Sequence, residues 1–423
     1  MATAVSTSTE YAAGGTTVDG LSLSANSVVI QTLEGQHTLS YSSDIIGVEV
    51  DNLTDCVVRG FDIDGFTRRG IDCFETSADG ATVTRHLFTL NFIHDILLDT
   101  GNAPTGIWAS GAQLYVLQNV IDNIHDDGIF LRGQNSVVTG NVIKRVSQGG
   151  STVGDCIQLS GAVDGSLVSF NYCDHSDVAS KQCIIVNGTG SGGAVVDNYC
   201  KMLNSVSAVS CLFINNPTWE VARNFCDGGD RSIRWSTSAG GSVGAGNVST
   251  GFALYGHEVT GSNVEVYQAT IDGGARGVQV NGNLTGVVVK NAIIVNASLF
   301  AIVAESANDV DYLAMYNNTG NVGFSGGASG ALTISNQFTA DPQFRDATAL
   351  DYRLESTSPY VGAGTMWWTP GAPPRGEDGL RFYTAPSLGA YEVRRDKPYT
   401  RSMASYAMKP LEMSSDILKA RRM

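Results

Sequence analysis

The sequence predicts an all-β protein built as a β-solenoid, in which short strands wind into roughly ten or more stacked coils. Three observations predict this fold. Charged residues make up only 16% of the 423-residue chain and glycine is abundant at 49 residues, a composition that with many β-branched side chains favours strands over helices. An asparagine-centred segment recurs along the chain, and a short run of alternating apolar residues follows each copy.

The recurring asparagine follows a short apolar run in segments such as FTLNFIHD, YVLQNVID and LVSFNYCD, at intervals of 22 to 30 residues. Repeats of this length indicate units that bury their apolar face only by stacking on their neighbours. Since stacked coils lie about 4.8 Å apart, we expect the side-chain amides to bond to one another in a ladder. The asparagines are Asn91, Asn119, Asn141, Asn171, Asn198, Asn224 and Asn247, and Asn291 and Asn317 extend the series.

A run of the form GI-x-L follows each asparagine, as in GIWA, GIFL and CIQL. Apolar residues stand two apart in these runs, for example Ile129 and Leu131, and Ile157 and Leu159. Because successive side chains of a strand point to opposite faces, this alternation predicts strands with one buried face.

Six of the eight cysteines take apolar positions of the repeat. Three stand two residues after the asparagine, where other coils have isoleucine, and three directly precede the GI-x-L strand. A thiol that replaces isoleucine behaves as a small hydrophobic group, and no CxxC pair indicates a zinc site. We therefore expect all eight, including Cys56 and Cys73, to be reduced core residues. The two columns are Cys173, Cys200 and Cys226, and Cys156, Cys183 and Cys211.

The charge of the chain is unevenly distributed. The formal net charge is −15, whereas the stretch from Tyr391 onward has eight Lys and Arg residues against four Asp and Glu residues. The acidic remainder is expected to repel nucleic acid and anionic membranes, so we predict neither as a partner. No window of about 18 continuous apolar residues predicts a membrane span, and we recognise no secretory leader in residues 1–20.

The end of the chain carries a second signature. Asp341–Thr365 has the sequence DPQFRDATALDYRLESTSPYVGAGT, and Ser387–Val393 has the sequence SLGAYEV. Together with the asparagine-corner coils, these segments resemble the right-handed parallel β-helix superfamily, which has the pectate-lyase-like fold. The resemblance implies a right-handed, single-stranded parallel β-helix. It divides the chain into an N-terminal cap or attachment segment at 1–50, the β-helix at 51–338, closing coils at 339–393 and a basic C-terminal tail at 394–423.

The resemblance implies several functions, because this fold hosts lyases, hydrolases, epimerases and non-catalytic adhesins. The missing leader favours a bacteriophage tailspike, a homotrimer of the virion tail that contacts other tail proteins and recognises a bacterial surface polysaccharide. One alternative is a non-catalytic adhesin or structural virion protein, and another is an extracellular polysaccharide lyase. Whether the protein is an enzyme that depolymerises the polysaccharide, as a glycoside hydrolase or as a lyase, stays open.

Two aspartates are the main catalytic candidates. When the coils are aligned on the GI-x-L strand, Asp127 and Asp155 stand in one column, with Lys181 one coil beyond. Their carboxyls are then about 5 Å apart, a separation that favours proton sharing and suits retaining glycoside hydrolysis. Asp126 adds a further carboxylate. Alternatively, the carboxylates hold Ca²⁺ for lyase chemistry with Lys181 as the base; no other cofactor or metal is expected.

These candidates also have structural interpretations. An Asp-Gly-Ile sequence commonly opens a strand, with the aspartate bonded within its own turn, and Asp127 fits that use. The Asp-Gly-Ile pattern does not assign such a turn hydrogen bond to Asp126. His175 and Asp177 stand near Lys181 in YCDHSDVASKQCI, which we expect to be a loop rather than a strand. That loop is either a charged surface loop or part of an acid and base group.

An outward-facing column of the same strands holds aromatic and polar residues. In chain order it contains Trp108, Phe130, Gln158, Ile185, Phe213 and Arg234. Such a row suits the stacking of sugars or contact between the subunits of a trimer. We favour a subunit interface for the apolar members, with sugars bound at its edge. The candidate glycan-binding residues are His125, Asp177, Gln158, Trp108 and Arg234.

Overall fold

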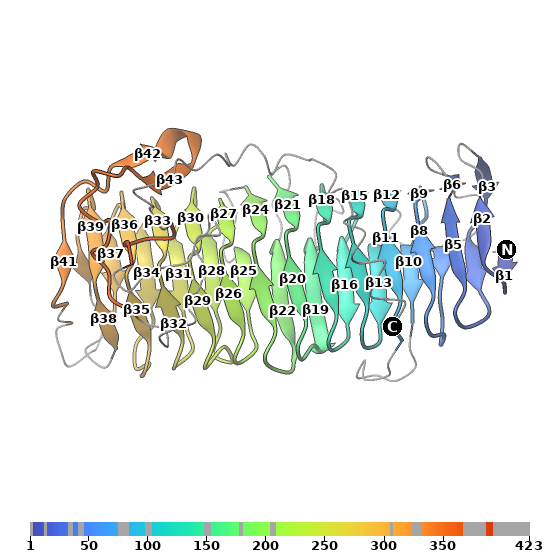
Figure 1. The fold of residues 1–423 in the computed structure, drawn as a ribbon, viewed down its shortest axis with the longest axis horizontal. Helices are drawn as coiled ribbons and strands as arrows, with labels where there is room; N and C mark the ends of the chain where they lie inside the picture. The colour runs from blue at the N-terminus through green and yellow to red at the C-terminus, as the bar shows by residue number, and fades with distance from the viewer. Residues whose placement is uncertain are drawn as a thin grey trace.

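The structure is a computed structural model, in which the chain forms one elongated solenoid (Figure 1). The strands stack along a single axis, from β1 at the N-terminal end to β41 at the other. The coil architecture predicted from the repeat is thus confirmed. The described residues are 3–11, 15–32, 37–40, 46–74, 84–97, 104–147, 154–176, 181–203, 209–304, 308–323, 332, 334–366 and 386–391.

Three long parallel sheets form the walls of the solenoid, and we call them sheets A, B and C. Sheet A has 14 strands and contains the GI-x-L runs. Its strands are β1 (Thr3–Val5), β4 (Leu21–Leu23), β7 (Ile46–Glu49), β10 (Arg69–Cys73), β13 (Thr105–Ser110), β16 (Ile129–Arg132), β19 (Ile157–Ala162), β22 (Ile184–Thr189), β25 (Ser210–Ile214), β28 (Arg231–Trp235), β31 (Tyr255–Val259), β34 (Arg276–Val280), β37 (Phe300–Val303) and β40 (Val322–Gly323).

Sheet B has 13 strands and contains the apolar runs that precede the asparagines. Most of its strands have three residues, because the chain turns sharply at the asparagine that follows. They are β2 (Thr9–Tyr11), β5 (Val29–Thr32), β8 (Val57–Arg59), β11 (Leu87–Thr89), β14 (Tyr115–Leu117), β17 (Val137–Thr139), β20 (Leu167–Ser169), β23 (Ala194–Val196), β26 (Glu220–Ala222), β29 (Val243–Ala245), β32 (Glu265–Tyr267), β35 (Val288–Lys290) and β38 (Asp309–Asp311).

Sheet C has 14 strands and begins directly after the asparagine corner. Its strands are β3 (Thr16–Val18), β6 (His37–Ser40), β9 (Phe61–Asp64), β12 (Phe92–Ile96), β15 (Val120–Ile124), β18 (Val142–Lys144), β21 (Tyr172–His175), β24 (Tyr199–Met202), β27 (Phe225–Asp227), β30 (Val248–Thr250), β33 (Thr270–Asp272), β36 (Ile293–Val295), β39 (Leu313–Tyr316) and β41 (Gln337–Phe338). Each of the first 13 coils thus contributes one strand to each sheet, in the order A, B, C, and the described part of the last coil contributes β40 to sheet A and β41 to sheet C.

The interior of the solenoid is filled by one continuous apolar core. On β16, Ile129 and Leu131 are fully buried, whereas Phe130 and Arg132 point outward. Ile129 pairs in register with Ile107 of the preceding coil. Because the same register holds from coil to coil, each apolar position becomes a column, and every coil buries its neighbour's inner face.

The asparagine ladder runs without a break from Asn91 to Asn247. Each side-chain amide donates to the Oδ1 of the next asparagine, with Nδ2–Oδ1 distances of 2.9 to 3.1 Å. The same Oδ1 also accepts the backbone N–H of the preceding asparagine, as between Asn119 and Asn141. The ladder therefore satisfies buried backbone donors that no strand partner reaches.

The extension of the ladder to Asn291 and Asn317 is wrong. Strand register places Ala269 and Ala292 at the ladder position of the next two coils. Asn291 stands one residue earlier, in a left-handed conformation with φ 59°, and its Oδ1 accepts the backbone N–H of Thr365 at 2.8 Å. Alanine has no amide to continue the ladder, so the corner of these coils is apolar instead.

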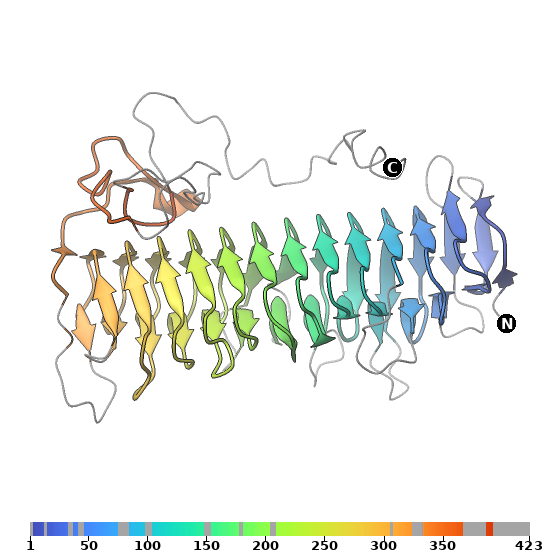
Figure 2. The same ribbon diagram turned by 60° about the horizontal axis from the view of Figure 1, so that its bottom comes forward.

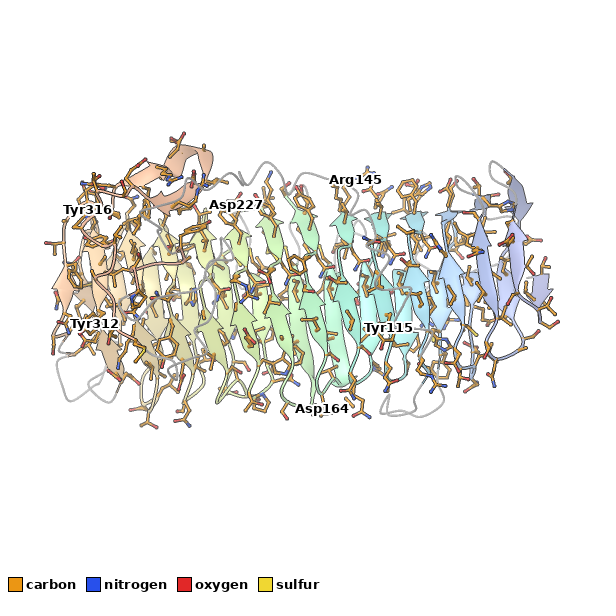
Figure 3. All side chains as sticks on the ribbon, in the orientation of Figure 1. Tyr115, Arg145, Asp164, Asp227, Tyr312 and Tyr316 are labelled. Carbon is orange, nitrogen blue, oxygen red and sulfur yellow. The ribbon has the colours of Figure 1, made fainter. Side chains whose placement is uncertain are left out.

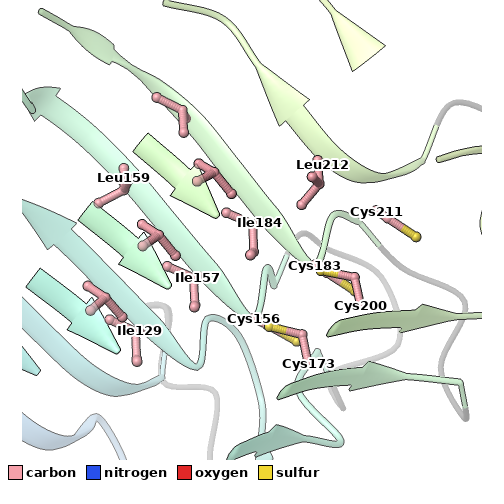
Figure 4. Packing of buried hydrophobic residues seen from close by; sticks show 14 of the residues in the cluster. Ile129, Cys156, Ile157, Leu159, Cys173, Cys183, Ile184, Cys200, Cys211 and Leu212 are labelled. Atoms are coloured by element: carbon pink, nitrogen blue, oxygen red, sulfur yellow. The ribbon is translucent and has the colours of Figure 1, made fainter. Parts of the chain in front are cut away.

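The cysteines are buried and free, as predicted. Cys173, Cys200 and Cys226 pair in register on sheet C. Figure 4 shows thiols of the two predicted columns beside one another at the inner corner between sheets C and A. The column that begins with Cys173 stands where preceding coils have isoleucine, such as Ile143. The column that begins with Cys156 stands where they have glycine, such as Gly128.

The described residues of the segment 339–393 lie along the flank of the solenoid. Its described part contains the antiparallel strands β42 (Phe344–Asp346) and β43 (Asp351–Leu354), joined by a 3-10 turn at Ala347–Ala349. Tyr352 and Tyr391 pack against outward residues of sheet C, and the segment returns over the solenoid (Figure 2). Within the described residues, no helix is long and apolar enough to cross a membrane.

Candidate functional site

Asp127 and Asp155 stand on consecutive coils, as the alignment predicts, but both lie inside the protein. They are 4% and 2% exposed. The backbone N–H of Asp155 donates to Asp127 Oδ1 at 2.7 Å, and the N–H of Gln182 donates to Asp155 Oδ1 at 2.7 Å. The two carboxyls thus tie three coils together at the corner between sheets C and A, which is a structural role.

Burial dominates the electrostatics of this pair. It raises the pKa of Asp155 from 3.8 to about 7. Burial, followed by the charges of Asp155 and Asp126, raises the pKa of Asp127 well above its ordinary value. The pair therefore tends to hold a proton, as the sequence suggested, but the proton is held away from any substrate in solvent.

The remaining candidates of this corner differ in exposure. Asp126 is buried, whereas His125 and Lys181 are each partly exposed. The charge of Lys181 lowers the pKa of both Asp127 and Asp155, which shows that the ammonium group lies near them. The structure therefore brings these residues to one corner, with only His125 and Lys181 open to solvent.

His175 is not on a surface loop. It is the last residue of β21, is fully buried, and neither ring nitrogen has a hydrogen-bond partner among the described residues. Burial lowers its pKa to about 4. Preceding coils have an extra left-handed residue at this point, such as Asn123 or Arg145. The coil of β21 lacks it, so His175 points inward; Asp177 lies outside the described residues.

Three rings on consecutive coils, Phe74, Trp108 and Phe130, form an aromatic platform on the outer face of sheet A. The Trp108 ring centroid lies 5.5 Å from that of Phe74 and 5.8 Å from that of Phe130. The guanidinium of Arg69 lies 4.1 Å from the Trp108 centroid, and that of Arg132 lies 5.4 Å from the Phe130 centroid. All three rings reach solvent, and Phe74 is 42% exposed.

Gln158 and Arg234 follow the platform in the same column. Gln158 pairs in register with Phe130 and is partly exposed. Arg234 is four coils from Phe130, about 19 Å at the usual strand separation, and its guanidinium packs over Phe213 and lies 3.1 Å from Glu258. Gln158 thus borders the platform, whereas Arg234 belongs to a separate ion-paired group.

A group of carboxylates beside the platform was not predicted from the sequence. Asp72 precedes Trp108 in the outward column and forms an ion pair with Arg69. Asp51 accepts the backbone N–H of Phe74 at 3.2 Å. Burial, then the charges of Glu49 and Asp72, raise the pKa of Asp51 to about 6. Extending the aligned column two coils toward the N-terminus would have placed Glu49 and Asp72 on this face.

Such an arrangement can bind and protonate a sugar. Aromatic rings contact the apolar faces of pyranoses, and guanidinium groups donate to their oxygens. A carboxyl with a pKa near the working pH serves as a general acid. Because Asp51 is only half-buried, its proton is accessible to a bound glycan, in contrast to those of Asp127 and Asp155.

Comparison with known proteins supports the fold. No protein-family model and no curated protein matches the chain. The periplasmic alginate epimerase AlgG matches with a TM-score of 0.51 and 11% identity, over 77% of this chain and 78% of that one. The protein therefore has the fold of a parallel β-helix. The AlgG match supports the fold of this β-helix only, because the identity is low.

Two further solved structures resemble this β-helix. Pectate lyase Pel9A has a TM-score of 0.48 and 11% identity, covering 88% of this chain and 89% of that one. The Dettilon tailspike protein has a TM-score of 0.48 and 13% identity, covering 72% of this chain and 61% of that one.

Within the described part of the β-helix, one group of side chains is arranged to hold a metal ion: Asp64, His94 and Asp95 on sheet C. The expected Ca²⁺ ligands around Asp127 and Asp155 do not converge in this way. Their inner oxygens accept backbone N–H groups, which are donors that a cation would displace.

Proposed function

We propose that the protein binds a polysaccharide along the outer face of sheet A, across the aromatic platform. The observation that carries this proposal is the row of three solvent-reaching rings on consecutive coils, with Arg69 packed against the central ring, Trp108, and Arg132 packed against Phe130. Successive coils repeat the contact at about 4.8 Å, so an extended polymer can lie along the column. Gln158 supplies the next polar contact.

Hydrolysis of the bound glycan is a second candidate function, which Asp51 favours. Its carboxyl stands next to the platform with a pKa raised to about 6. In this proposal Asp51 protonates the leaving oxygen. Asp72 is 4% exposed and paired with Arg69, so it acts on Asp51 through its charge and does not contact the sugar. A lyase would release unsaturated products instead, and a non-catalytic adhesin would release none.

We also propose the biological setting: a virion tailspike that acts on a bacterial surface polysaccharide as a homotrimer, attached to other tail proteins. An outward apolar residue on sheet A supports the trimer. Phe213 follows the platform in its column, is partly exposed and would pack against a second subunit, whereas Ile185 is already buried within one chain. Light scattering of the purified protein tests this, and a monomeric mass at micromolar concentration would contradict it.

The binding proposal is tested with a panel of bacterial capsular and lipopolysaccharide-derived glycans. For a glycan that binds the wild type, we expect Trp108→Ala to weaken binding at least tenfold, because the central ring of the platform is lost. Tyr115→Ala is the matched control, since Tyr115 is an exposed ring on sheet B. Equal affinity of Trp108→Ala and the wild type for every glycan bound would refute the platform as the binding surface.

The hydrolysis proposal is tested on the glycan that binds. Reducing ends should accumulate without the ultraviolet absorbance of unsaturated sugars, and Asp51→Asn should abolish their release while binding is retained. Asp127→Asn is the control, because its carboxyl lies inside the fold. Loss of turnover in Asp127→Asn but not in Asp51→Asn would contradict the proposal and indicate that the active site lies at the corner of Asp127.

A further inference from the structure

A second cluster of ionisable side chains lies on the outer face of sheet C, on a different wall from the aromatic platform. Strand register places His94 of β12 beside Asp64 of β9. His94 Nδ1 lies 2.7 Å from Asp95 Oδ2 and 3.5 Å from Asp64 Oδ1. The three atoms all lie within 4.8 Å of one another, so one nitrogen and two carboxylate oxygens converge on a single point.

The spacing of these atoms suits a small divalent ion. Ligands held about 2.1 Å from an ion are separated by about 3.0 Å in an octahedron and about 3.4 Å in a tetrahedron. The observed separations of 2.7 and 3.5 Å lie close to both values. Only small side-chain rotations are therefore needed to admit an ion, and water can complete its coordination on the solvent side.

The imidazole of His94 is already oriented for ligation. Its Nε2 lies 2.9 Å from Asp62 Oδ1, which suits a proton on Nε2. Its Nδ1 is hydrogen-bonded to Asp95 Oδ2, and a bound ion would take the place of the proton in that contact. A carboxylate behind a ligating histidine fixes its tautomer and raises its basicity. Asp62 is held in turn by Thr38, which is not part of the cluster. The hydroxyl of Thr38 donates to Asp62 Oδ2 at 3.1 Å.

The backbone positions the remaining ligand. Asp95 has a left-handed conformation, with φ 57°, and this residue is the extra one that β12 has and β21 lacks. It turns the Asp95 side chain back over His94 instead of along the strand. The amide of Asn123, one coil further, donates to the second oxygen of Asp95, so the carboxylate is held from outside as well.

The local charge also favours a cation. Three carboxylates, from Asp62, Asp64 and Asp95, surround one imidazole. The guanidinium of Arg145 is engaged by Asp122 in a two-point contact, at 2.7 and 2.6 Å. Among the described residues, no Lys or Arg forms an ion pair with the three carboxylates, so a divalent ion would neutralise most of their charge.

We propose that Asp64, His94 and Asp95 form a binding site for a divalent transition-metal ion, with Zn²⁺ as the best match, and that Asp62 is its positioning residue. A nitrogen and two carboxylate oxygens form a mixed donor set that zinc accepts, and imidazole favours it over Ca²⁺ or Mg²⁺. The ion would link β9 to β12 and so staple two adjacent coils. This inference is independent of the proposed glycan site.

The test uses the full chain without an affinity tag, stripped of metal by a chelator and titrated with Zn²⁺ alone by calorimetry. We expect one equivalent to bind to the wild type. His94→Gln should abolish binding, and Asp62→Asn should weaken it roughly 10- to 100-fold, the usual effect of losing the carboxylate behind a ligand. Asp174→Asn is the matched control, because Asp174 lies in the same outward column but away from the cluster.

The eight cysteines require a spectroscopic check, since thiols also bind zinc. Replacement with Co²⁺ should give the weak visible bands of an oxygen and nitrogen site, without the intense near-ultraviolet band of cobalt bound to sulfur. Thermal unfolding should shift upward with added Zn²⁺ in the wild type and not in His94→Gln. The proposal is overturned if the wild type does not bind Zn²⁺, if folded His94→Gln binds it equally, or if the cobalt spectrum shows sulfur ligands.

Discussion

Two polar ladders cross the coils of this β-helix, one of asparagines at the corner between sheets B and C and one of aspartates at the corner between sheets C and A. Both place a side-chain oxygen where it accepts a backbone N–H of an adjacent coil. The asparagine amide also donates to the next side chain, so that ladder continues over seven residues from Asn91 to Asn247. A carboxylate only accepts, and a stack of carboxylates accumulates charge.

This difference explains why the aspartate ladder is short. Asp127 and Asp155 occupy two consecutive coils, and Gln182 takes the position in the third. Each added carboxylate would raise the pKa of its neighbours further, because burial already disfavours their charged forms. A feature that resembles a catalytic dyad in sequence is therefore a hydrogen-bonding corner made with an acidic residue.

The largest effect is expected from breaking the asparagine ladder at its centre. Asn141→Ala removes the acceptor of both the backbone and side-chain N–H groups of Asn119. Leaving these donors buried without partners should lower the free energy of unfolding by about 4 kcal/mol, as measured by urea denaturation. Asn187→Ala, at an exposed asparagine outside the ladder, should change it by less than about 0.5 kcal/mol.

A smaller effect is expected at the aspartate corner. Asp127→Ala leaves the buried N–H of Asp155 without its acceptor and should cost about 2 kcal/mol in urea denaturation. Asp127→Asn keeps an oxygen at the same place and removes a buried charge, so it should be at least as stable as the wild type at pH 8. Equal destabilisation by both variants would show that the charge itself is required.

The aspartate corner should also make stability depend on pH. The fold raises the pKa of Asp155 from 3.8 to about 7, so between these values the native state keeps a proton that the unfolded chain releases. Its contribution to stability is present below about pH 4 and is lost as the pH rises through about 7. Asp155→Asn should flatten this part of the profile, measured by urea denaturation from pH 4 to 8; an unchanged profile would contradict the assignment.

The smallest effect is expected from Lys181. Its charge lowers the pKa of Asp127 and Asp155 and so offsets part of the cost of their ionisation. Lys181→Gln should lower the free energy of unfolding at pH 8 by about 0.5 kcal/mol, because the ammonium is partly solvated. At pH 4 the same variant should match the wild type, and a deficit there would indicate a packing role instead.

The interior of the protein was predictable from local sequence. The columns of Ile129 and Leu131, the core cysteines and the asparagine ladder all follow from a repeat that places equivalent residues one coil apart. The same alignment placed Asp127 beside Asp155. It did not show that both carboxyls face inward, because an aspartate before Gly-Ile suits a turn, a core corner and an exposed site equally well.

The outer faces were predictable only in part. Trp108, Phe130 and Gln158 were placed in one outward column, whereas Phe74, Asp51 and Asp72 were missed because that column was not extended to the coils that precede Trp108. His175 was assigned to a loop, since one omitted left-handed residue is enough to reverse the direction of a side chain. The flank position of the segment around Tyr352 depends on contacts with coils about 100 residues earlier in the chain.

By itself, the sequence of this protein determined the fold class, the coil register and the identity of the core, because these depend on a period that short segments repeat. The tertiary structure decided which polar groups remain in contact with solvent. It buried Asp127, Asp155 and His175 and left Asp51 accessible beside the platform. Exposure is set jointly by neighbouring coils and by the returning C-terminal segment, and no single segment of sequence contains that information.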